Sequence, residues 1–244
     1  MVIEINTQEF NELFRKAREE VLEITKENPN TIVETKSLND LIKKITSLFV
    51  VDAVKDTVIK TIRTEFIMGA LFGEEQINKL KPFNYSTDDY VIEFLSNYTF
   101  DNVKDMTDDI AKGLRTQLQI AFMNGEGKKK IKERVKQVFD VGDNRAMTIA
   151  RTEIRRARQM GTYSAWKESG IPVKKWIRMK DDERTSEISR AINKKYGTPK
   201  QAIPLEENFK ATVKVGKKTI VIDQLTPPFH PNERCETIYE VIEE

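Results

Sequence analysis

The chain has 244 residues, of which 39% are hydrophobic and 33% are charged, so it is long enough to bury one large or two small cores. This composition excludes a long disordered protein, and no apolar run approaches the roughly 18 residues that a membrane helix needs. One cysteine excludes an internal disulfide, and one histidine with one cysteine cannot form a tetrahedral zinc site without carboxylates. The first ten residues lack the features of a secretory signal, so we expect a reducing environment.

The net charge of +2 is unevenly distributed along the chain. Residues 1–125 contain 15 Lys and Arg against 21 Asp and Glu, whereas residues 126–200 contain 21 against 10. Residues 201–244 contain 5 against 8 and are again acidic. A basic centre between acidic ends indicates either a contact with a polyanion or an ordinary lysine-rich surface, and the sequence leaves both open.

The first 170 residues are predicted to be helical. Apolar residues recur at helical spacing over residues 7–27 and again from Ser37 to about Met68. Gly69 and Gly73 mark either a break or a close contact between helices. Four more helical stretches are predicted: one opening at Thr87, one over 101–123, a basic one over 128–139 and one over 145–169, with Gly142-Asp143-Asn144 separating the last two.

The pattern changes after Pro172, because proline lacks an amide donor and restricts the residue before it. Strands are predicted over 173–179 and 236–242, with a short helix between them over 184–195. A hairpin is predicted from residues 211–215 and 219–222, with Gly216 at the first central turn position.

We therefore predict an α+β fold, with a long helical N-terminal region and a small C-terminal α+β module that contains a short antiparallel sheet. The predicted divisions are a helical region over 1–125, basic helices over 126–171, and the module over 172–244.

Three motifs of the C-terminal half stand in a fixed order. The helix AMTIARTEIRRARQMGTYSAWKESGI contains an Arg-Thr-Glu core, KKWIRMKDDERTSEI places a tryptophan before an acidic-Arg-Thr turn, and TPPFHPNERCE lies near the end. Together they resemble the phage head-morphogenesis family of Mu F-like minor capsid proteins over roughly residues 100–242. The residues that carry the resemblance are Arg151, Thr152, Glu153, Trp176, Asp182, Arg184, Thr185, Pro227, Pro228, His230, Pro231, Asn232, Arg234 and Cys235.

The resemblance implies a virion protein of the capsid interior that is made in the host cytoplasm during assembly. Its implied partners are the portal protein, other capsid proteins and packaged double-stranded DNA, and oligomers are compatible with it. Two positions depart from the family pattern, since Ile188 and Glu233 stand where the family often has His or Cys. Any metal site built on those family residues cannot form in the same way here, and we predict no metal, no cofactor and no enzymatic activity.

Residues 146–161 place small apolar side chains in one helical stripe, which would let another helix or a sheet approach closely. Glu153 lies at the margin of this stripe. It pairs either with Arg156 at i, i+3 on the surface, or with Arg184 or Arg234 of the module.

Other residues allow a structural and a functional interpretation. Trp176 between basic residues suits a strand core better than stacking on a base. Asp182 is expected to cap the turn at Arg184 and Thr185 rather than to hold Mg²⁺. His230 and Asn232 are expected to form structural hydrogen bonds, and Cys235 is expected to be buried and unpaired.

The cationic candidates for DNA contact lie on the predicted basic helices. A general nucleic-acid-binding helical protein is the first alternative function, and a metal-dependent nuclease or a transferase is the second. The candidate DNA-binding residues are Lys128, Lys129, Lys130, Lys132, Arg134, Lys136, Arg155 and Arg158.

Overall fold

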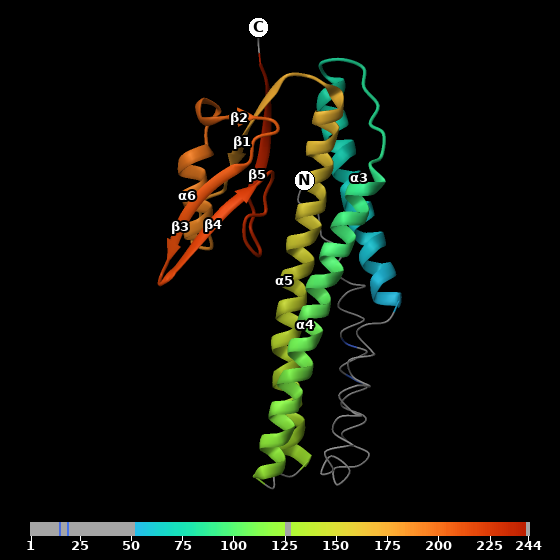
Figure 1. Cartoon of the computed structure of the whole chain (residues 1–244), viewed down its shortest axis with the longest axis vertical. Coiled ribbons are helices and arrows are strands. Elements are labelled where there is room, and N and C mark those ends of the chain that lie inside the picture. The colour runs from blue at the N-terminus through green and yellow to red at the C-terminus, as the bar shows by residue number, and fades with distance from the viewer. Residues whose placement is uncertain (1–14, 16–18, 20–51, 125–127, 243–244) are drawn as a thin grey trace. The chain divides into compact units, whose positions relative to one another are not determined.

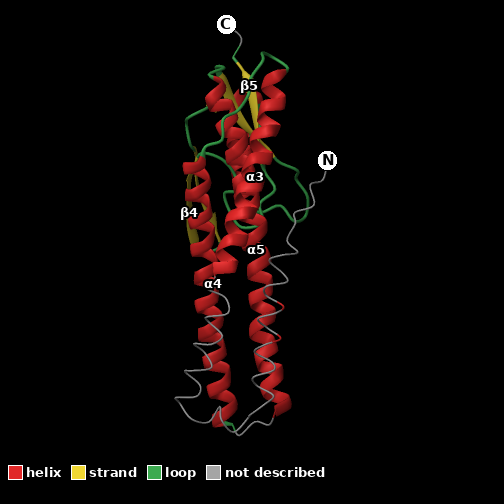
Figure 2. Ribbon diagram, turned by 90° about the vertical axis from the view of Figure 1, so that its right-hand side faces the viewer, coloured by secondary structure: helices red, strands yellow, loops and turns green. Residues whose placement is uncertain are grey.

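A computed structural model of the chain describes residues 15, 19, 52–124 and 128–242 (Figure 1). Of the helix predicted over 7–27 only Arg15 and Glu19 are described, and both are helical, whereas the start of the helix predicted from Ser37 lies outside the described residues. Long helices come first and strands follow, which confirms the predicted α+β class (Figure 2). The elements are α3 (Asp52–Asn78), α4 (Asp89–Met123), α5 (Lys128–Ser169), β1 (Val173–Arg178), α6 (Glu187–Tyr196), the 3₁₀ helix η2 (Pro199–Gln201), β2 (Ile203–Pro204), β3 (Phe209–Val215), β4 (Lys218–Gln224) and β5 (Glu236–Val241).

Two predicted helix boundaries are wrong. The helix that begins at Asp89 runs without interruption to Met123, and α5 continues through Gly142 instead of ending there. Phe139, Ala146 and Ala150 are buried on both sides of that glycine. One glycine inside a helix costs only about 1 kcal/mol relative to alanine, which burial of a continuous apolar stripe offsets.

The strands form two small antiparallel sheets. The first has the order β2-β1-β5, and β1 pairs along its whole length with β5, from Val173 opposite Val241 to Arg178 opposite Glu236. The second is the predicted hairpin of β3 and β4. Gly216 has a φ of 59° in its two-residue turn, a conformation that glycine adopts without steric cost.

The chain divides into two compact units whose limits differ from the three predicted ranges. One unit, here called the helical unit, comprises residues 1–60 and 96–151. The other, here called the mixed unit, comprises residues 61–95 and 152–244. Helices α4 and α5 each contribute to both units, so the predicted change near residue 172 marks a change from helix to strand rather than the limit of a compact unit.

Glycines allow α3 and α5 to approach closely within the mixed unit. A Cβ atom built on Gly161 would lie 2.0 Å from the Phe66 carbonyl oxygen, and one built on Gly69 would lie 2.0 Å from the Arg158 carbonyl oxygen. Thr162 Oγ1 donates a hydrogen bond of 2.9 Å to the Gly69 carbonyl at the same contact. The predicted small-residue stripe therefore does meet a helix, and Gly69 marks a close contact rather than a break.

The interior of the C-terminal module contains an unexpected charge. Val173, Lys175 and Ile177 are the buried residues of β1, and Trp176 is half-buried on the opposite side of the strand. The prediction that Trp176 lies in the core is confirmed only in part, because the alternation of the strand puts Lys175 at the fully buried position beside it. The Lys175 ammonium donates to the Leu225 carbonyl at 2.8 Å and lies 5.1 Å from the centre of the Phe209 ring.

Among the described residues, no helix combines the length and the hydrophobicity needed to cross a bilayer.

Candidate functional site: the motif cluster of the C-terminal module

His230 is the centre of a compact polar cluster in the mixed unit. Its Nδ1 lies 2.9 Å from the Pro231 carbonyl oxygen, and its Nε2 lies 2.7 Å from Ser186 Oγ and 2.8 Å from Ser189 Oγ. Because a carbonyl can only accept, Nδ1 carries a proton, and Nε2 of the neutral ring accepts from a serine hydroxyl. Ser186 is also the N-cap of α6, where its Oγ accepts from the Ser189 amide at 3.0 Å.

Glu233 lies beside His230, and its side chain is completely buried. One carboxylate oxygen accepts from Ser189 Oγ at 3.0 Å, and the other accepts from the Phe229 amide. Since the Ser189 hydroxyl donates to Glu233, the single proton of the Ser186 hydroxyl is shared between His230 Nε2 at 2.7 Å and Ser189 Oγ at 3.2 Å. A buried carboxylate needs such partners, because an unpaired charge in a protein interior is strongly destabilising.

Asp182 and Arg234 form the second part of the cluster. The guanidinium of Arg234 donates to both carboxylate oxygens of Asp182, at 2.8 and 2.5 Å. Asp182 Oδ1 also accepts from the Arg184 amide at 3.0 Å, which is the predicted capped turn, closed by the Thr185 amide on the Asp182 carbonyl. The hydrogen bonds from Arg234 hold the pKa of Asp182 well below its usual range.

The cluster is attached to α5 by Thr152 of the Arg-Thr-Glu motif and by Arg155, three residues later. Thr152 Oγ1 accepts from the Asn232 amide at 3.0 Å, and Arg155 donates to the Glu233 carbonyl at 2.8 Å. The module therefore docks on the predicted helix. Asn232 adopts a φ of 58°, which asparagine tolerates better than most residues.

Glu153 does not bridge the module and the helix. Its carboxylate accepts from Arg156 Nε at 2.8 Å on the same helix. The predicted pairing with Arg184 or Arg234 is wrong because Asp182 already holds the Arg234 guanidinium. The Glu153–Arg156 pair is nevertheless more buried than a surface pair, with side-chain exposures of 7% and 20%.

Cys235 is buried and forms no disulfide, as predicted. Burial raises the pKa of its thiol above the ordinary value, and the Glu233 carboxylate acts in the same direction. A cavity of about 20 Å³ adjoins His230, Glu233 and Cys235, and space of that size suits a single water rather than a substrate. In the described part of the chain, no three His, Cys, Asp or Glu side chains converge as metal ligands would.

The three motifs that define the cluster lie inside a region with a recognised family signature. A family model described as "Phage Mu protein F like protein" matches residues 112–238, just over half of the chain. The chain belongs to the phage Mu F-like family. Neither curated proteins nor solved structures gave a significant match. Membership makes this a phage head-morphogenesis protein and associates it with the virion.

The family match covers the whole cluster and the part of α5 that holds it. The motif residues Thr152, Asp182, His230 and Arg234 all donate or accept hydrogen bonds within the mixed unit. Pro228 is buried, whereas the Arg151 and Arg184 side chains are exposed. The Mu F-like motifs thus hold the module together and fasten it to α5.

The cationic candidates for DNA contact separate into two groups. Arg155 and Arg158 are occupied within the mixed unit, since Arg155 binds the Glu233 carbonyl and Arg158 pairs with Glu65. Both guanidinium groups therefore serve contacts inside the fold, and their contact with DNA stays a prediction. Lys129, Lys130 and Lys136 are exposed in the first turns of α5, and Arg134 donates to Gln117 at 2.7 Å. The side chains of Lys128 and Lys132 lie outside the described part of the structure.

The sequence patterns did not predict that Ser186 and Ser189 belong to the His230 cluster, or that Lys175 is buried in the core. The capping preference of serine before a helix could have indicated Ser186. The sequence indicates Glu233 only as a departure from the family pattern. The other departure is Ile188, but the next residue, Ser189, is the one that contacts His230.

Proposed function

We propose that this protein is a minor capsid protein that associates with the portal and lies in the head interior during capsid assembly and DNA packaging or delivery. Membership of the Mu F-like family supports this proposal. The observation that carries it is the use of the motif side chains, since Thr152, Asp182 and Arg234 connect one element to another. Such residues build a rigid module for assembly rather than bind and transform a substrate.

Co-purification with the portal protein tests this role directly. The tagged full-length chain and the portal protein of the same phage are co-expressed, with the major capsid protein as the comparison. We expect the portal to co-elute at a fixed ratio. Purified virions should contain the chain, and intact heads should protect it from added protease while opened heads should not. Absence from purified virions would overturn the proposal.

We also propose that the protein acts without catalysing a reaction. The small cavity beside His230 and the occupied hydrogen bonds of Ser186 and Ser189 support this view. Incubation of supercoiled plasmid with the protein and Mg²⁺, Mn²⁺ or Zn²⁺ tests the nuclease alternative. Plasmid cleavage that co-purifies with the protein and is lost in His230→Ala would show that the protein is an enzyme.

A second candidate function is weak, sequence-independent binding of packaged DNA. Exposed Lys129 and Lys136 favour it, because residues seven apart on a helix share a face. Neutralising phosphates with lysines releases counterions, so we expect a dissociation constant of roughly 10⁻⁴–10⁻⁶ M at physiological salt and a steep fall in affinity as salt rises.

Fluorescence anisotropy with labelled duplexes of two unrelated sequences measures this binding. The pair Lys129→Glu and Lys136→Glu should weaken binding of both duplexes equally, as should reversal of Lys128, Lys129 and Lys130 together. The matched control is Lys217→Glu with Lys218→Glu, which makes the same charge change on two exposed lysines of the β3–β4 hairpin. Equal losses in test and control would assign the effect to net charge, and no binding at low salt would exclude the DNA role.

A further inference from the structure

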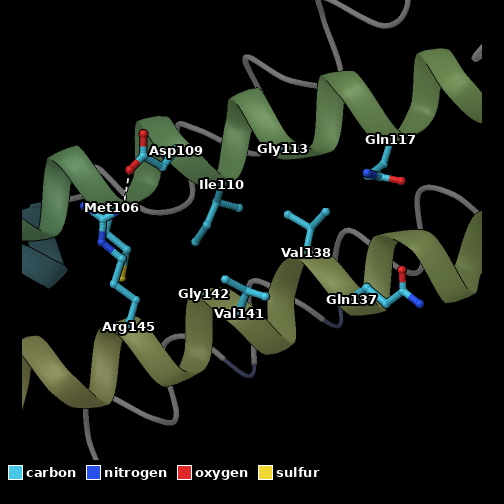
Figure 3. Close-up of a pocket in the computed structure, with 10 residues that line it drawn as sticks. All are labelled: Met106, Asp109, Ile110, Gly113, Gln117, Gln137, Val138, Val141, Gly142 and Arg145. Atoms are coloured by element: carbon cyan, nitrogen blue, oxygen red, sulfur yellow. Dashed lines mark hydrogen bonds and ion pairs between the residues drawn. The ribbon is translucent and has the colours of Figure 1, made fainter. Parts of the chain in front are cut away.

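An apolar groove lies along the contact of α4 and α5 in the helical unit (Figure 3). Its volume is about 300 Å³, and Ile110, Val138 and Val141 supply much of its apolar lining. Gly113 lets the two helices approach closely in this groove, because a Cβ atom there would come within 3.2 Å of Val138 Cγ1. Val141 stands 71% exposed beside this hollow, so the same face offers both a protruding apolar side chain and a place to receive one.

Polar groups close the two ends of the groove. Figure 3 shows the ion pair of Asp109 and Arg145 at one end and Gln117 with Gln137 at the other. An apolar centre with a polar rim is the arrangement of a protein–protein contact.

The contacts across the groove show that α4 and α5 run antiparallel. Asp109 meets Arg145, Gly113 meets Val138 and Gln117 meets Arg134, so the partner number falls as the α4 number rises. Acidic residues of α4 lie toward the Asp109 end, where Arg145 of α5 pairs with Asp109, and the basic residues of the first turns of α5 lie toward the Gln117 end. On the groove side of their helices these charges are Asp105 and Asp109 at the first end, and Lys130 and Arg134 at the second.

We propose that this groove binds a second copy of the same chain, antiparallel and with a two-fold axis close to Val141. A two-fold interface brings the same patch of both copies together. The antiparallel arrangement places the acidic end of each groove against the basic end of the other, whereas a parallel one would oppose like charges. Each Val141 then packs beside its symmetry mate over the hollow at Gly113.

The two groups of lysines on α5 allow this contact to coexist with the proposed DNA contact. At about 100° per residue, Lys130, Arg134 and Val141 share the groove side of the helix. Lys129 and Lys136 point roughly 100° or more away from Lys130 by the same geometry. The Lys129 and Lys136 variant therefore tests DNA binding without changing the self-association surface, whereas the triple variant that includes Lys130 changes both. Self-association does not rest on the proposed function, and either can fail without the other.

Cysteine cross-linking tests the position of the two-fold axis. In Val141→Cys, the two new thiols of a dimer lie close enough for a disulfide, which needs Cα atoms within about 7 Å. We expect a covalent dimer under mild oxidation of the full-length protein. The matched control is Val221→Cys, because Val221 is 72% exposed on β4, and the native Cys235 is buried. Equal cross-linking of the two variants, or none in Val141→Cys, would overturn the proposal.

Charge reversal with rescue tests the antiparallel orientation. Sedimentation equilibrium of the wild type should show a dimer at protein concentrations up to about 100 µM, well above a micromolar dissociation constant. Lys130→Glu and Asp105→Lys, both at exposed positions, should each weaken association by on the order of tenfold. The double variant should recover wild-type association, because the two reversed charges then face each other across the interface as an opposite pair.

Circular dichroism of each variant verifies that the helices remain folded. A wild type that stays monomeric over the whole concentration range at low salt would overturn the proposal. Failure of the double variant to recover would overturn the antiparallel arrangement, since additive losses indicate that the two side chains do not meet.

Discussion

All four charged residues that are buried in the described part of the chain, Glu65, Glu153, Lys175 and Glu233, belong to the mixed unit. In the helical unit the buried residues of α4 are mostly apolar and recur every three or four positions from Val103 to Ala121. Ion pairs in the described part of this unit, such as Asp109 with Arg145, lie on the surface. One unit is thus stabilised chiefly by apolar burial, and the other by directional polar contacts in its interior as well.

The difference shows where structural specificity resides. Apolar stripes tolerate substitutions that conserve size and spacing, whereas a buried carboxylate or ammonium requires its partners at fixed distances. The family match covers only residues 112–151 of the helical unit, but it covers the whole polar cluster of the mixed unit. Substitutions of the same kind in the two units should therefore have unequal effects.

The largest difference is expected from one substitution made in each unit. Gly161→Ala places a Cβ atom on the Phe66 backbone, whereas Gly113→Ala meets only the Val138 side chain at 3.2 Å. We expect Gly161→Ala to lower the free energy of unfolding by roughly 3 kcal/mol or more. Gly113→Ala should stay within about 1 kcal/mol of wild type, because alanine favours the helix. Urea denaturation followed by circular dichroism measures both. Equal losses would show that the two helix contacts are equally tight.

Lys175 provides the next largest effect and a pH dependence. Burial lowers the pKa of its ammonium to about 7, from an ordinary value of 10.5. Between these values the unfolded chain binds more protons than the folded one, so this group makes the fold more stable as pH rises from 7 to 10.5. Lys175→Met should stabilise the protein at pH 7 by about 1–2 kcal/mol and flatten this rise.

The difference between the unfolding free energies of wild type and Lys175→Met, measured from pH 6 to 9, isolates the contribution of this lysine. The gap should narrow as pH rises. A gap that stays constant would mean that the Lys175 ammonium titrates alike in the folded and unfolded chains. Lys174→Met, at the exposed neighbouring position of β1, is the control and should leave the pH dependence unchanged.

A smaller effect is expected where the module meets α5. Thr152→Val keeps the side-chain shape but removes the oxygen that accepts from the Asn232 amide. We expect the free energy of unfolding to fall by about 1 kcal/mol, the usual contribution of one hydrogen bond. Thr148→Val, one turn earlier on the same helix, removes a hydroxyl that donates to the Asn144 carbonyl and should change stability by less than about 0.5 kcal/mol. Thermal unfolding measures both variants, and a larger loss of stability in Thr148→Val than in Thr152→Val would contradict this expectation.

The smallest effect is expected at Glu153. Burial raises the pKa of this carboxyl above its ordinary value, against the opposing effect of Arg156. The folded protein therefore holds this proton to higher pH than the unfolded chain, so stability falls as pH rises from about 4.5 through the raised folded value. Glu153→Gln should lack this fall and differ from wild type by less than about 1 kcal/mol at pH 7. If Glu153→Gln instead lowered the free energy of unfolding by roughly 3 kcal/mol, the result would indicate that Glu153 forms a buried ion pair with the module.

Local sequence patterns predicted much of the secondary structure. Gly216 in its turn, the strands at 173 and 236, and the helix near residue 187 follow from turn chemistry, alternation and capping, which depend on near neighbours. The turn at Asp182 was predicted for the same reason. The continuity of α5 through Gly142 was not, because the burial that offsets the cost of this glycine is provided by residues distant in sequence.

The sequence by itself determined the α+β class, the family motifs and the burial of Cys235, since each follows from composition, spacing or a short pattern. Only the tertiary structure decided which side chains meet. It paired Arg234 with Asp182 rather than Glu153, turned Lys175 instead of Trp176 inward, and brought Ser186 and Ser189 to His230. These partners lie dozens of residues apart, and a charged or polar group in the interior binds whichever complementary group the packing brings within hydrogen-bond distance.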